Sequence, residues 1–252
     1  MLITSFNILA DVFIENNKAF LTRWYPSIAY SDLLMRNRFQ TMIKYIKGDI
    51  VMLQEVTPYV CAKLKEVFID KYDFMPLSLH NSATKITGNL TMLKRGRFAK
   101  VRHETRFLDG YRAFGLTTAD DLYIHNIHLS DLSDKTRIRQ MKKILAMYDN
   151  DTIDKRLIIG GDFNSNSPVL HKLLRDSSFT NHIKEKKGTY ICEPSIIDYI
   201  YIHGFSQKSV MNKIHNIIDS DKEICYNQTI KKYGSDHHPV YLKIMNPVSK
   251  DD

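Results

Sequence analysis

The sequence predicts an α/β fold in which two mixed β-sheets pack together and helices cover their outer faces. Strand-like and helix-like segments alternate along all 252 residues. The closely spaced strands between residues 72 and 129 have no helix between them, so they must pair antiparallel. No linker rich in Pro, Gly or Ser divides the chain, and we expect a single domain over residues 1–252.

Eight segments have the apolar composition of buried strands and form the expected sheets. In chain order they are residues 2–8, 49–56, 90–94, 112–118, 122–129, 156–161, 196–202 and 239–244.

Four helices are marked by apolar spacing or by an N-cap. The first covers residues 36–47, and the others begin at Thr57-Pro58, Ser133 and Ser167-Pro168. Their inward faces are expected to carry Phe39, Met42, Ile43 and Ile46; Leu64, Val67 and Phe68; Ile138, Met141, Leu145 and Tyr148; and Leu170, Leu173 and Leu174. The aromatic-rich segment 9–35 has no clear period, and we expect a partly ordered excursion there.

Composition narrows the class of protein. The net charge of +8 favours a polyanionic partner such as nucleic acid. The cysteines Cys61, Cys192 and Cys225 are odd in number and widely spaced, which argues against a disulfide framework or a zinc knuckle. The first ten residues are typical of a strand rather than a signal peptide, and no stretch approaches the roughly 20 apolar residues that span a bilayer. We therefore expect a cytoplasmic or nuclear protein, no membrane attachment and no obligate protein partner.

Strong polar residues fall at the ends of six predicted strands, next to apolar core. They are Asn7; Glu55; Asn126 and His128; Asp162 and Asn164; Asp198; and the run Asp236, His237 and His238. Taken singly, each is explained by a turn or a cap. Taken together, they indicate one cleft at one edge of the sheets. Within "GGDFNS", residues i and i+2 of a strand share a face, so Asp162 and Asn164 are expected to reach the same group. The glycines before them are expected to let the chain approach that cleft.

The chemistry of this set indicates a hard divalent cation. Glu55, Asp162 and Asp236 offer carboxylate oxygens, and Asn7 and Asn164 offer amide oxygens, which suit Mg²⁺ or its substitute Mn²⁺ rather than zinc. Histidines can donate to phosphate oxygens, and a carboxylate can orient and deprotonate a water. These parts fit metal-assisted attack on a phosphorus ester.

Six motifs in this order resemble the endonuclease/exonuclease/phosphatase superfamily, whose deoxyribonuclease I-like fold is a four-layer α/β/β/α sandwich with the active site at one edge. They are "SFNILAD", "MLQEV", "NIHLS", "GGDFNS", "IIDYIYI" and "SDHHPV", and they span residues 5 to 240. The resemblance therefore covers nearly the whole chain.

The resemblance implies a role for each matching residue. Glu55 would be the principal Mg²⁺ ligand with Asn7 beside it, and Asp236 a supplementary metal or water ligand. Asp162 would position or deprotonate the attacking water. Four further assignments concern the phosphate: Asn164 holds it, His237 contacts it and is oriented by Asp198, and His128 contacts it from the other side. His238 is expected to be structural, because the family motif uses the first histidine after the aspartate.

The substrate is the least defined part of the prediction. The motifs are most similar to the deadenylase and nocturnin-like group, which implies a 3′–5′ exoribonuclease on single-stranded RNA. A 5′-tyrosyl-DNA phosphodiesterase or a DNA endonuclease is the alternative, although the former tend to have Thr where this chain has Phe163. A phosphoinositide or sphingomyelin phosphoesterase is less favoured, because no membrane anchor is evident. A catalytically inactive binding module is disfavoured because every motif position keeps its chemistry.

Several residues are expected to contact the nucleic acid. Asn126, Arg95 and Arg97 are the candidate substrate-binding residues. Further basic candidates are Lys94, Lys100, Arg102, Arg137, Arg139, Lys142 and Lys143, and Trp24, Tyr25 and Tyr30 could stack on bases.

Overall fold

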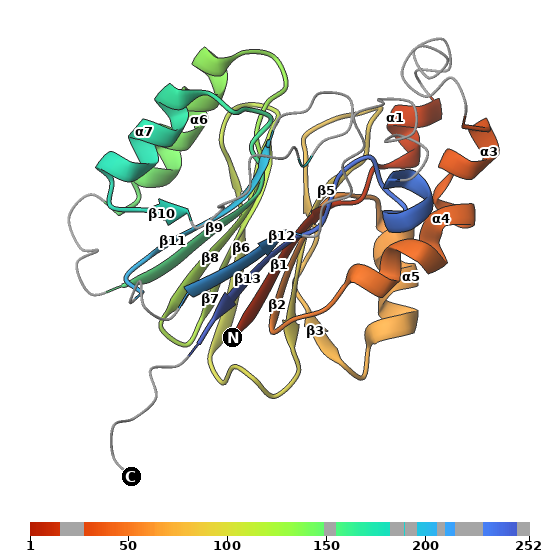
Figure 1. The fold of residues 1–252 in the computed structure, drawn as a ribbon, viewed down its shortest axis with the longest axis horizontal. Coiled ribbons are helices and arrows are strands. Elements are labelled where there is room, and N and C mark those ends of the chain that lie inside the picture. The colour runs from red at the N-terminus through yellow and green to blue at the C-terminus, as the bar shows by residue number, and fades with distance from the viewer. Residues whose placement is uncertain are drawn as a thin grey trace.

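The computed structural model describes residues 1–15, 28–148, 155–181, 189, 196–205, 210–214 and 229–245, and shows two packed sheets between two groups of helices (Figure 1). Within these residues, one sheet has seven strands in the order β12-β13-β1-β2-β5-β3, with β4 also paired to β5. The other has six strands in the order β10-β11-β9-β8-β7-β6. The predicted α/β/β/α sandwich is confirmed.

The elements have the following bounds. The first sheet consists of β1 (Leu2–Asn7), β2 (Ile50–Val56), β3 (Tyr72–Phe74), β4 (Ser78–Leu79), β5 (Gly88–Lys94), β12 (Val210–Ile214) and β13 (Val240–Ile244). The second consists of β6 (Val101–Phe107), β7 (Ala113–Ala119), β8 (Leu122–His128), β9 (Arg156–Asp162), β10 (Thr180–Asn181) and β11 (Asp198–His203). The helices are α1 (Asp11–Glu15), α3 (Tyr30–Leu33), α4 (Met35–Met42), the 3₁₀ helix η1 (Ile43–Tyr45), α5 (Pro58–Phe68), α6 (Asp134–Leu145) and α7 (Pro168–Asp176).

All eight predicted strands form, with ends shifted by at most two residues. The prediction missed β6 because this strand lies at the edge of its sheet. Its side chains are mostly exposed, and five of the seven in "VRHETRF" are charged or polar. An edge strand gains little from apolar burial, so its sequence does not show the pattern of a core strand. The short strands β3, β4 and β10 and strand β12 were also missed.

The helix starts were predicted well, and their inner faces less so. Thr57 Oγ1 accepts a hydrogen bond from Val60 N at 3.2 Å, and Ser133 Oγ accepts one from Thr136 N at 3.2 Å, as N-caps do. Ser167 makes no such cap bond. The helix expected over 36–47 becomes 3₁₀ after Met42. Val67 is 47% exposed, so its expected inward position was wrong.

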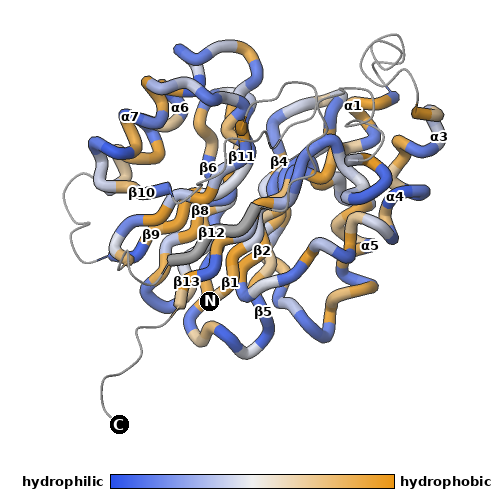
Figure 2. Tube along the Cα trace, viewed as in Figure 1, coloured by the Kyte–Doolittle hydropathy of each residue, from blue (hydrophilic) through white to orange (hydrophobic). Residues whose placement is uncertain are grey.

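Three apolar cores separate the four layers. One, with Met52, Ile124 and Ile200, lies between the sheets. A second packs the first sheet against α4 and α5, and a third packs the other sheet against α6 and α7. Figure 2 shows apolar residues along the strands and polar ones on the outer surfaces of the helices. Among the described residues, no helix is both long and apolar enough to cross a membrane.

Strand direction brings the polar residues to one edge. β1 runs parallel to β2, and β8 runs parallel to β9, so Asn7 and the end of β2 meet in one sheet while His128 pairs with Asp162 in the other. β11 is antiparallel to β9, which places Asp198 directly opposite Asp162. β13 is antiparallel to β1, so residues before Val240 return to the end of β1. The predicted gathering at one edge therefore follows from the sheet topology.

The two glycines of β9 serve packing rather than access to the cleft. A Cβ on Gly160 would lie 2.2 Å from the Met52 Cε of the facing sheet, and one on Gly161 would lie 1.8 Å from the Ile127 carbonyl oxygen. Gly161 also has φ +150°, which disfavours residues with a side chain. We expected these glycines to let the chain approach the cleft. In the structure they instead allow close contact with β8 and with the other sheet.

Candidate active site

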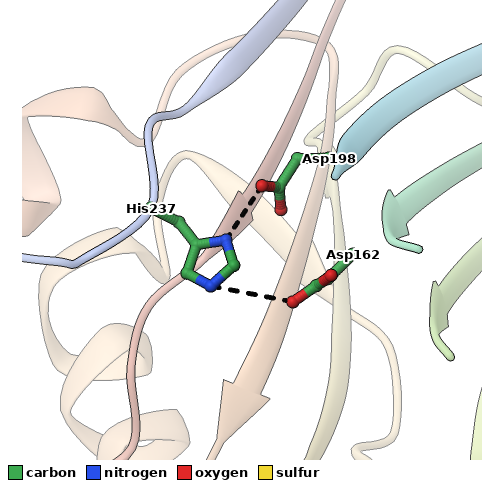
Figure 3. A group of neighbouring side chains, drawn as sticks. All are labelled: Asp162, Asp198 and His237. Carbon is green, nitrogen blue, oxygen red and sulfur yellow. Dashed lines mark hydrogen bonds and ion pairs between the residues drawn. The ribbon is translucent and has the colours of Figure 1, made fainter. Parts of the chain in front are cut away.

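The centre of the site is an imidazole held between two carboxylates (Figure 3). His237 Nδ1 donates to Asp198 Oδ2 at 2.8 Å, and its Nε2 lies 3.7 Å from Asp162 Oδ2. All three side chains are buried. Ser235 Oγ donates to the Asn7 carbonyl oxygen at 2.7 Å and accepts from His237 N at 3.2 Å, which fixes this loop against the end of β1.

Asn7 links the two sheets at this point. Its Nδ2 donates to Glu55 Oε1 at 3.0 Å and to Asp162 Oδ2 at 2.9 Å, while its Oδ1 accepts from Leu9 N at 3.1 Å. The amide therefore presents its nitrogen to the carboxylates. Its expected role as a metal ligand, which needs the oxygen, stays a prediction that requires a rotation of the amide.

Glu55 lies at a backbone irregularity in β2. The register between β2 and β5 shifts between Leu53 and Val56, and Glu55 has φ +59°. Such a bulge redirects a side chain, and strained backbone of this kind is concentrated at functional sites. Glu55 Oε2 accepts from Ala10 N at 2.8 Å. The two carboxylate oxygens are thus oriented by the end of β1.

Charge is distributed unevenly among these buried groups. Burial and the repulsion from Asp198 raise the pKa of Asp162 to about 7, against the lowering effect of His237. Burial alone would lower the pKa of His237, but the carboxylates of Asp198, Asp162 and Asp236 together raise it well above its ordinary value. His237 is therefore a buried imidazolium, and Asp162 is a carboxyl that exchanges its proton near neutrality.

His128 has the opposite character. Its Nε2 lies 3.6 Å from Asp162 Oδ2. Burial, together with the positive charge of Arg112 and the rings of His80 and His237, lowers its pKa well below its ordinary value. His128 is therefore neutral, and the site combines one charged and one neutral imidazole on either side of Asp162.

Asn164 is positioned by a turn and not by a strand. β9 ends at Asp162, and Asn164 has φ +50°. Asp162 Oδ1 accepts from Asn164 N at 2.8 Å, and Asn164 Nδ2 donates to the Leu129 carbonyl oxygen at 2.9 Å. The expectation that Asp162 and Asn164 share a strand face was wrong. An aspartate side chain bonded two residues ahead forms a local turn that stops the strand.

Asn126 bonds the two sheets together, and these bonds do not support the substrate contact predicted for it. It is fully buried between the sheets. Its Nδ2 donates to the carbonyl oxygens of Leu53 at 3.2 Å and Leu90 at 2.9 Å, and its Oδ1 accepts from Gln54 Nε2 at 2.8 Å. The polar residue at this strand end joins the two sheets.

Replacing Asn126 by leucine should destabilise the protein. Asn126→Leu removes one acceptor of Gln54 Nε2, which keeps its bond to the Met52 carbonyl oxygen, and removes the donor to two buried carbonyl oxygens. The free energy of unfolding should therefore fall by about 2–4 kcal/mol. Urea titration followed by circular dichroism measures this change. A difference below about 0.5 kcal/mol, as for a surface substitution, would contradict the structural role.

Arg95 and Arg97 follow β5 at the opposite edge of the sheets, a position that does not support their predicted substrate contact. β5 is antiparallel to β2, which pairs Gly88 with Val56 beside Glu55 and carries Lys94 to the far end. Arg95 Nε instead donates to the exposed Asp73 at 3.2 Å. Of the aromatic candidates, Tyr30 is 37% exposed, and Trp24 and Tyr25 lie outside the described residues.

Three residues near the site were not singled out from the sequence. Arg38 is buried and donates to the carbonyl oxygens of Ile8 and Gly234, which lie close in sequence to Asn7 and Asp236. His80 and Arg112 lie close to His128. Arg38 is one of several basic residues in a polar helix, and His80 lies in a loop without a motif, so no local pattern distinguishes them. His238, expected to be structural, is buried with its Nε2 3.2 Å from Thr229 Oγ1.

The donor set fits a divalent cation. Burial and the repulsion from Asp236 raise the pKa of Glu55, against the lowering effect of its bonds to Ala10 and Asn7. Hard oxygen donors in this arrangement suit Mg²⁺ or Mn²⁺. Asp162, Asp198 and His237 also bring one potential ligand atom each within 4.8 Å of one another. However, His237 uses Nδ1 for Asp198 and is charged, so the pair Glu55 and Asp236 is the better candidate for holding the ion.

Comparison with known proteins identifies the fold. No protein-family model matches the chain, and no curated protein matches it in sequence. Solved structures do match. ANGEL2, a 2′,3′-cyclic phosphatase in complex with adenosine-2′,3′-vanadate, superposes with a TM-score of 0.72 at 15% identity, covering 97% of this chain and 96% of that one. An endonuclease/exonuclease/phosphatase from Bacteroides vulgatus superposes with a TM-score of 0.66 at 15% identity, covering 96% and 98%. The chain has the endonuclease/exonuclease/phosphatase fold.

A third structure agrees with this assignment. Humanized TDP2 from D. rerio superposes with a TM-score of 0.64 at 18% identity, covering 98% of this chain and 99% of that one. The fold expected from the six sequence motifs is therefore confirmed over nearly the whole chain. At identities of 15–18%, these structures show the fold alone.

Proposed function

We propose that the protein is a metal-dependent phosphoesterase whose catalytic groups are those gathered around Asp162. The observation that carries this proposal is the buried chain Asp198–His237–Asp162, with Asn7 joining Asp162 to Glu55. Buried carboxylates this close together are costly for folding, and such costs are concentrated at functional sites. ANGEL2, which has the same fold, is a phosphatase.

Each residue has a role that its position supports. Glu55 and Asp236 would hold Mg²⁺, which when bound supplies positive charge to a phosphate oxygen and its leaving group. Asp162, whose pKa is about 7, would accept a proton from the attacking water. The charged His237, oriented by Asp198, would donate to the phosphate from one side, and the neutral His128 from the other. Asn164 would border the same phosphate.

Nucleic acid is the substrate class that we favour. The net charge of +8 would attract a polyanion, and ANGEL2 was solved with an adenosine-2′,3′-vanadate. Within this class we propose 3′–5′ exoribonuclease action on single-stranded RNA, because the sequence motifs are most similar to the deadenylase and nocturnin-like group. A 5′-tyrosyl-DNA phosphodiesterase or DNA endonuclease is the second candidate. That candidate is less favoured because tyrosyl-DNA phosphodiesterases tend to have Thr at the position of Phe163. In this chain Phe163 is buried against Tyr199 and Tyr201.

The first experiment separates these activities. Single-stranded oligoadenylate labelled at its 3′ end and at its 5′ end is incubated with Mg²⁺, alongside a circular single strand. A 3′–5′ exonuclease releases labelled mononucleotide from the 3′-labelled strand at once, shortens the 5′-labelled strand stepwise and leaves the circle intact. Cutting of the circle would show an endonuclease. If only a 5′-phosphotyrosyl oligonucleotide is hydrolysed, the result would favour a 5′-tyrosyl-DNA phosphodiesterase.

Glu55→Gln tests whether the activity belongs to this site. It removes a charged ligand without changing size, so kcat should fall by about 10²-fold or more, while binding of the oligonucleotide is retained. Glu66→Gln is the matched control, because Glu66 is exposed and pairs only with Lys63 on α5 among the described contacts. If Glu55→Gln and Glu66→Gln hydrolyse the substrate equally, the proposed site is wrong.

A further inference from the structure

A half-buried carboxylate, Asp109, organises the loop between β6 and β7. Its Oδ1 accepts from Tyr111 N at 2.8 Å and from Arg112 N at 2.6 Å, and its Oδ2 accepts from Gln140 Nε2 at 2.6 Å. Burial raises the pKa of Asp109, but these three bonds and the charge of Arg112 outweigh it and lower the pKa below its ordinary value. Asp109 is therefore an ionised acceptor that closes the turn and joins it to α6.

Gln140 connects this loop to the segment that follows β8. It lies on α6 and is fully buried. Its Oε1 accepts from Ser130 N at 2.9 Å, while its Nε2 donates to Asp109. Ser130 follows Leu129, whose N donates to the Asp162 carbonyl oxygen at 2.9 Å. One buried amide thus ties the β6–β7 loop to the end of β8 beside the candidate active site.

Arg112 is the charged side chain that these connections place near His128. The next residue, Ala113, donates its N–H to His80 Nδ1 at 3.1 Å, and the ring of His80 lies edge to face with that of His128, with centroids 5.9 Å apart. Burial is the largest cause that lowers the pKa of His128, and the positive charge of Arg112 is the next. The backbone contacts and the charge effect agree on this position of the guanidinium.

The guanidinium of Arg112 has a partner that a phosphate can replace. The side chain is buried, and its Nη2 lies 3.1 Å from Asp131 Oδ1. Asp131 is 73% exposed, and an ion pair with so exposed a carboxylate contributes little to stability. Arginine binds phosphate through a planar group that can make two parallel hydrogen bonds. Arg112 is thus a buried cation that is suited to an incoming anion.

We propose that Asp109 and Gln140 are positioning residues of the phosphoesterase, and that they act by holding Arg112 beside His128. Asp109 fixes the backbone of Arg112, and Gln140 fixes the loop relative to the strand that carries His128. In this position the guanidinium adds positive charge where His128 contacts the phosphate. This contribution to catalysis rests on the proposed function, whereas the link between the two loops does not.

Exchanging the two polar groups tests the pair. Asp109→Asn turns an NH₂ group toward Gln140 Nε2, and Gln140 cannot respond by turning its amide, because Nε2 would then face Ser130 N. Gln140→Glu turns a carboxylate toward that of Asp109. Each single change should lower kcat/KM for bis(p-nitrophenyl) phosphate with Mg²⁺ by about tenfold, at a temperature where circular dichroism shows every variant folded.

The double variant should recover the activity. When Asp109→Asn and Gln140→Glu are combined, the new amide donates to the new carboxylate, which still accepts from Ser130 N, and the net charge equals that of wild type. Its kcat/KM should lie within about threefold of the wild-type value. Gln40→Glu makes the same chemical change at an exposed position of α4 and should have no effect. Single variants with wild-type kcat/KM, or a double variant no better than either, would overturn the proposal.

A double-mutant cycle tests whether the pair acts through Arg112. Arg112→Met should itself lower kcat/KM by about tenfold or more, and Gln140→Glu should then add a loss of less than about twofold. If Gln140 had only a structural role, the two losses would multiply in full, and that result would also overturn the proposal.

Amide hydrogen exchange tests the link between the loops without substrate. The N–H groups of Tyr111, Arg112 and Ser130 should exchange faster in each single variant and return to wild-type rates in the double variant. Equal rates in all four proteins would overturn the pairing. Failure of the proposed function has a different signature, because wild type itself would then not hydrolyse bis(p-nitrophenyl) phosphate.

Discussion

Asp162→Asn should lower kcat by about 10²- to 10⁴-fold and at the same time raise the melting temperature. The kinetic loss follows because an amide cannot take a proton from water, and a general base is worth about this factor. The gain in stability follows because burial and Asp198 raise the pKa of Asp162 to about 7, so that its ionised form is disfavoured in the folded state. Neutral asparagine removes that cost and can keep the bond that Oδ1 accepts from Asn164 N, at the loss of the single bond that Oδ2 accepts from Asn7 Nδ2.

The sign of the pH dependence is fixed by the two pKa values. Below the ordinary value of 3.8, Asp162 is protonated in the folded and unfolded states, and it contributes no penalty. As the pH rises from there to about 7, the unfolded state ionises first and the folded state is progressively penalised. The difference in melting temperature between Asp162→Asn and wild type should therefore grow from about pH 4 to pH 7, then level off.

Calorimetry in the presence of a chelator measures this difference without a contribution from bound cation. Hydrolysis of bis(p-nitrophenyl) phosphate with Mg²⁺ measures kcat on a substrate that does not depend on the choice among nucleic acids. Asp70→Asn makes the same chemical change at an exposed turn and should leave both quantities unchanged. A variant that is less stable than wild type at pH 7, or that keeps its kcat, would contradict the assignment of Asp162.

Arg38→Met should lower the free energy of unfolding by about 3–5 kcal/mol, the usual cost of breaking a buried charged network. The guanidinium is buried and donates to the carbonyl oxygens of Leu33 at 2.5 Å, Ile8 at 2.5 Å and Gly234 at 2.7 Å. It also donates to the Leu9 carbonyl oxygen and lies 3.4 Å from Asp11. Methionine fills much of the volume but leaves these acceptors unpaired.

The same substitution should reduce kcat, because Arg38 joins the two segments that carry the site. Ile8 follows Asn7, and Gly234 comes two residues before Asp236. Urea unfolding and bis(p-nitrophenyl) phosphate hydrolysis measure the two effects. Arg36→Met is the matched control, since Arg36 lies exposed on the same helix. Equal stability of the two variants would show that the buried network does not hold the segments together.

The sequence by itself determined the layers and the identity of the polar cluster. Buried strands such as 2–8 and 156–161 are visible because the hydrophobic effect requires continuous apolar segments wherever a strand is covered on both faces. Thr57 and Ser133 were found as caps because a cap satisfies backbone groups only a few residues away. The gathering of Glu55, Asp162 and His237 was predictable because carboxylates and imidazoles gain nothing from an apolar core.

The tertiary structure decided which of the polar residues face the site. Asn126 and Asp162 both lie near strand ends, yet one binds backbone carbonyls between the sheets and the other lies beside His237. The antiparallel direction of β5 places Arg95 away from the site, and the position of α4 lets Arg38 bond the carbonyl oxygens of Ile8 and Gly234. These outcomes depend on the pairing of segments far apart in the chain, and contacts of that kind leave no local pattern in the sequence.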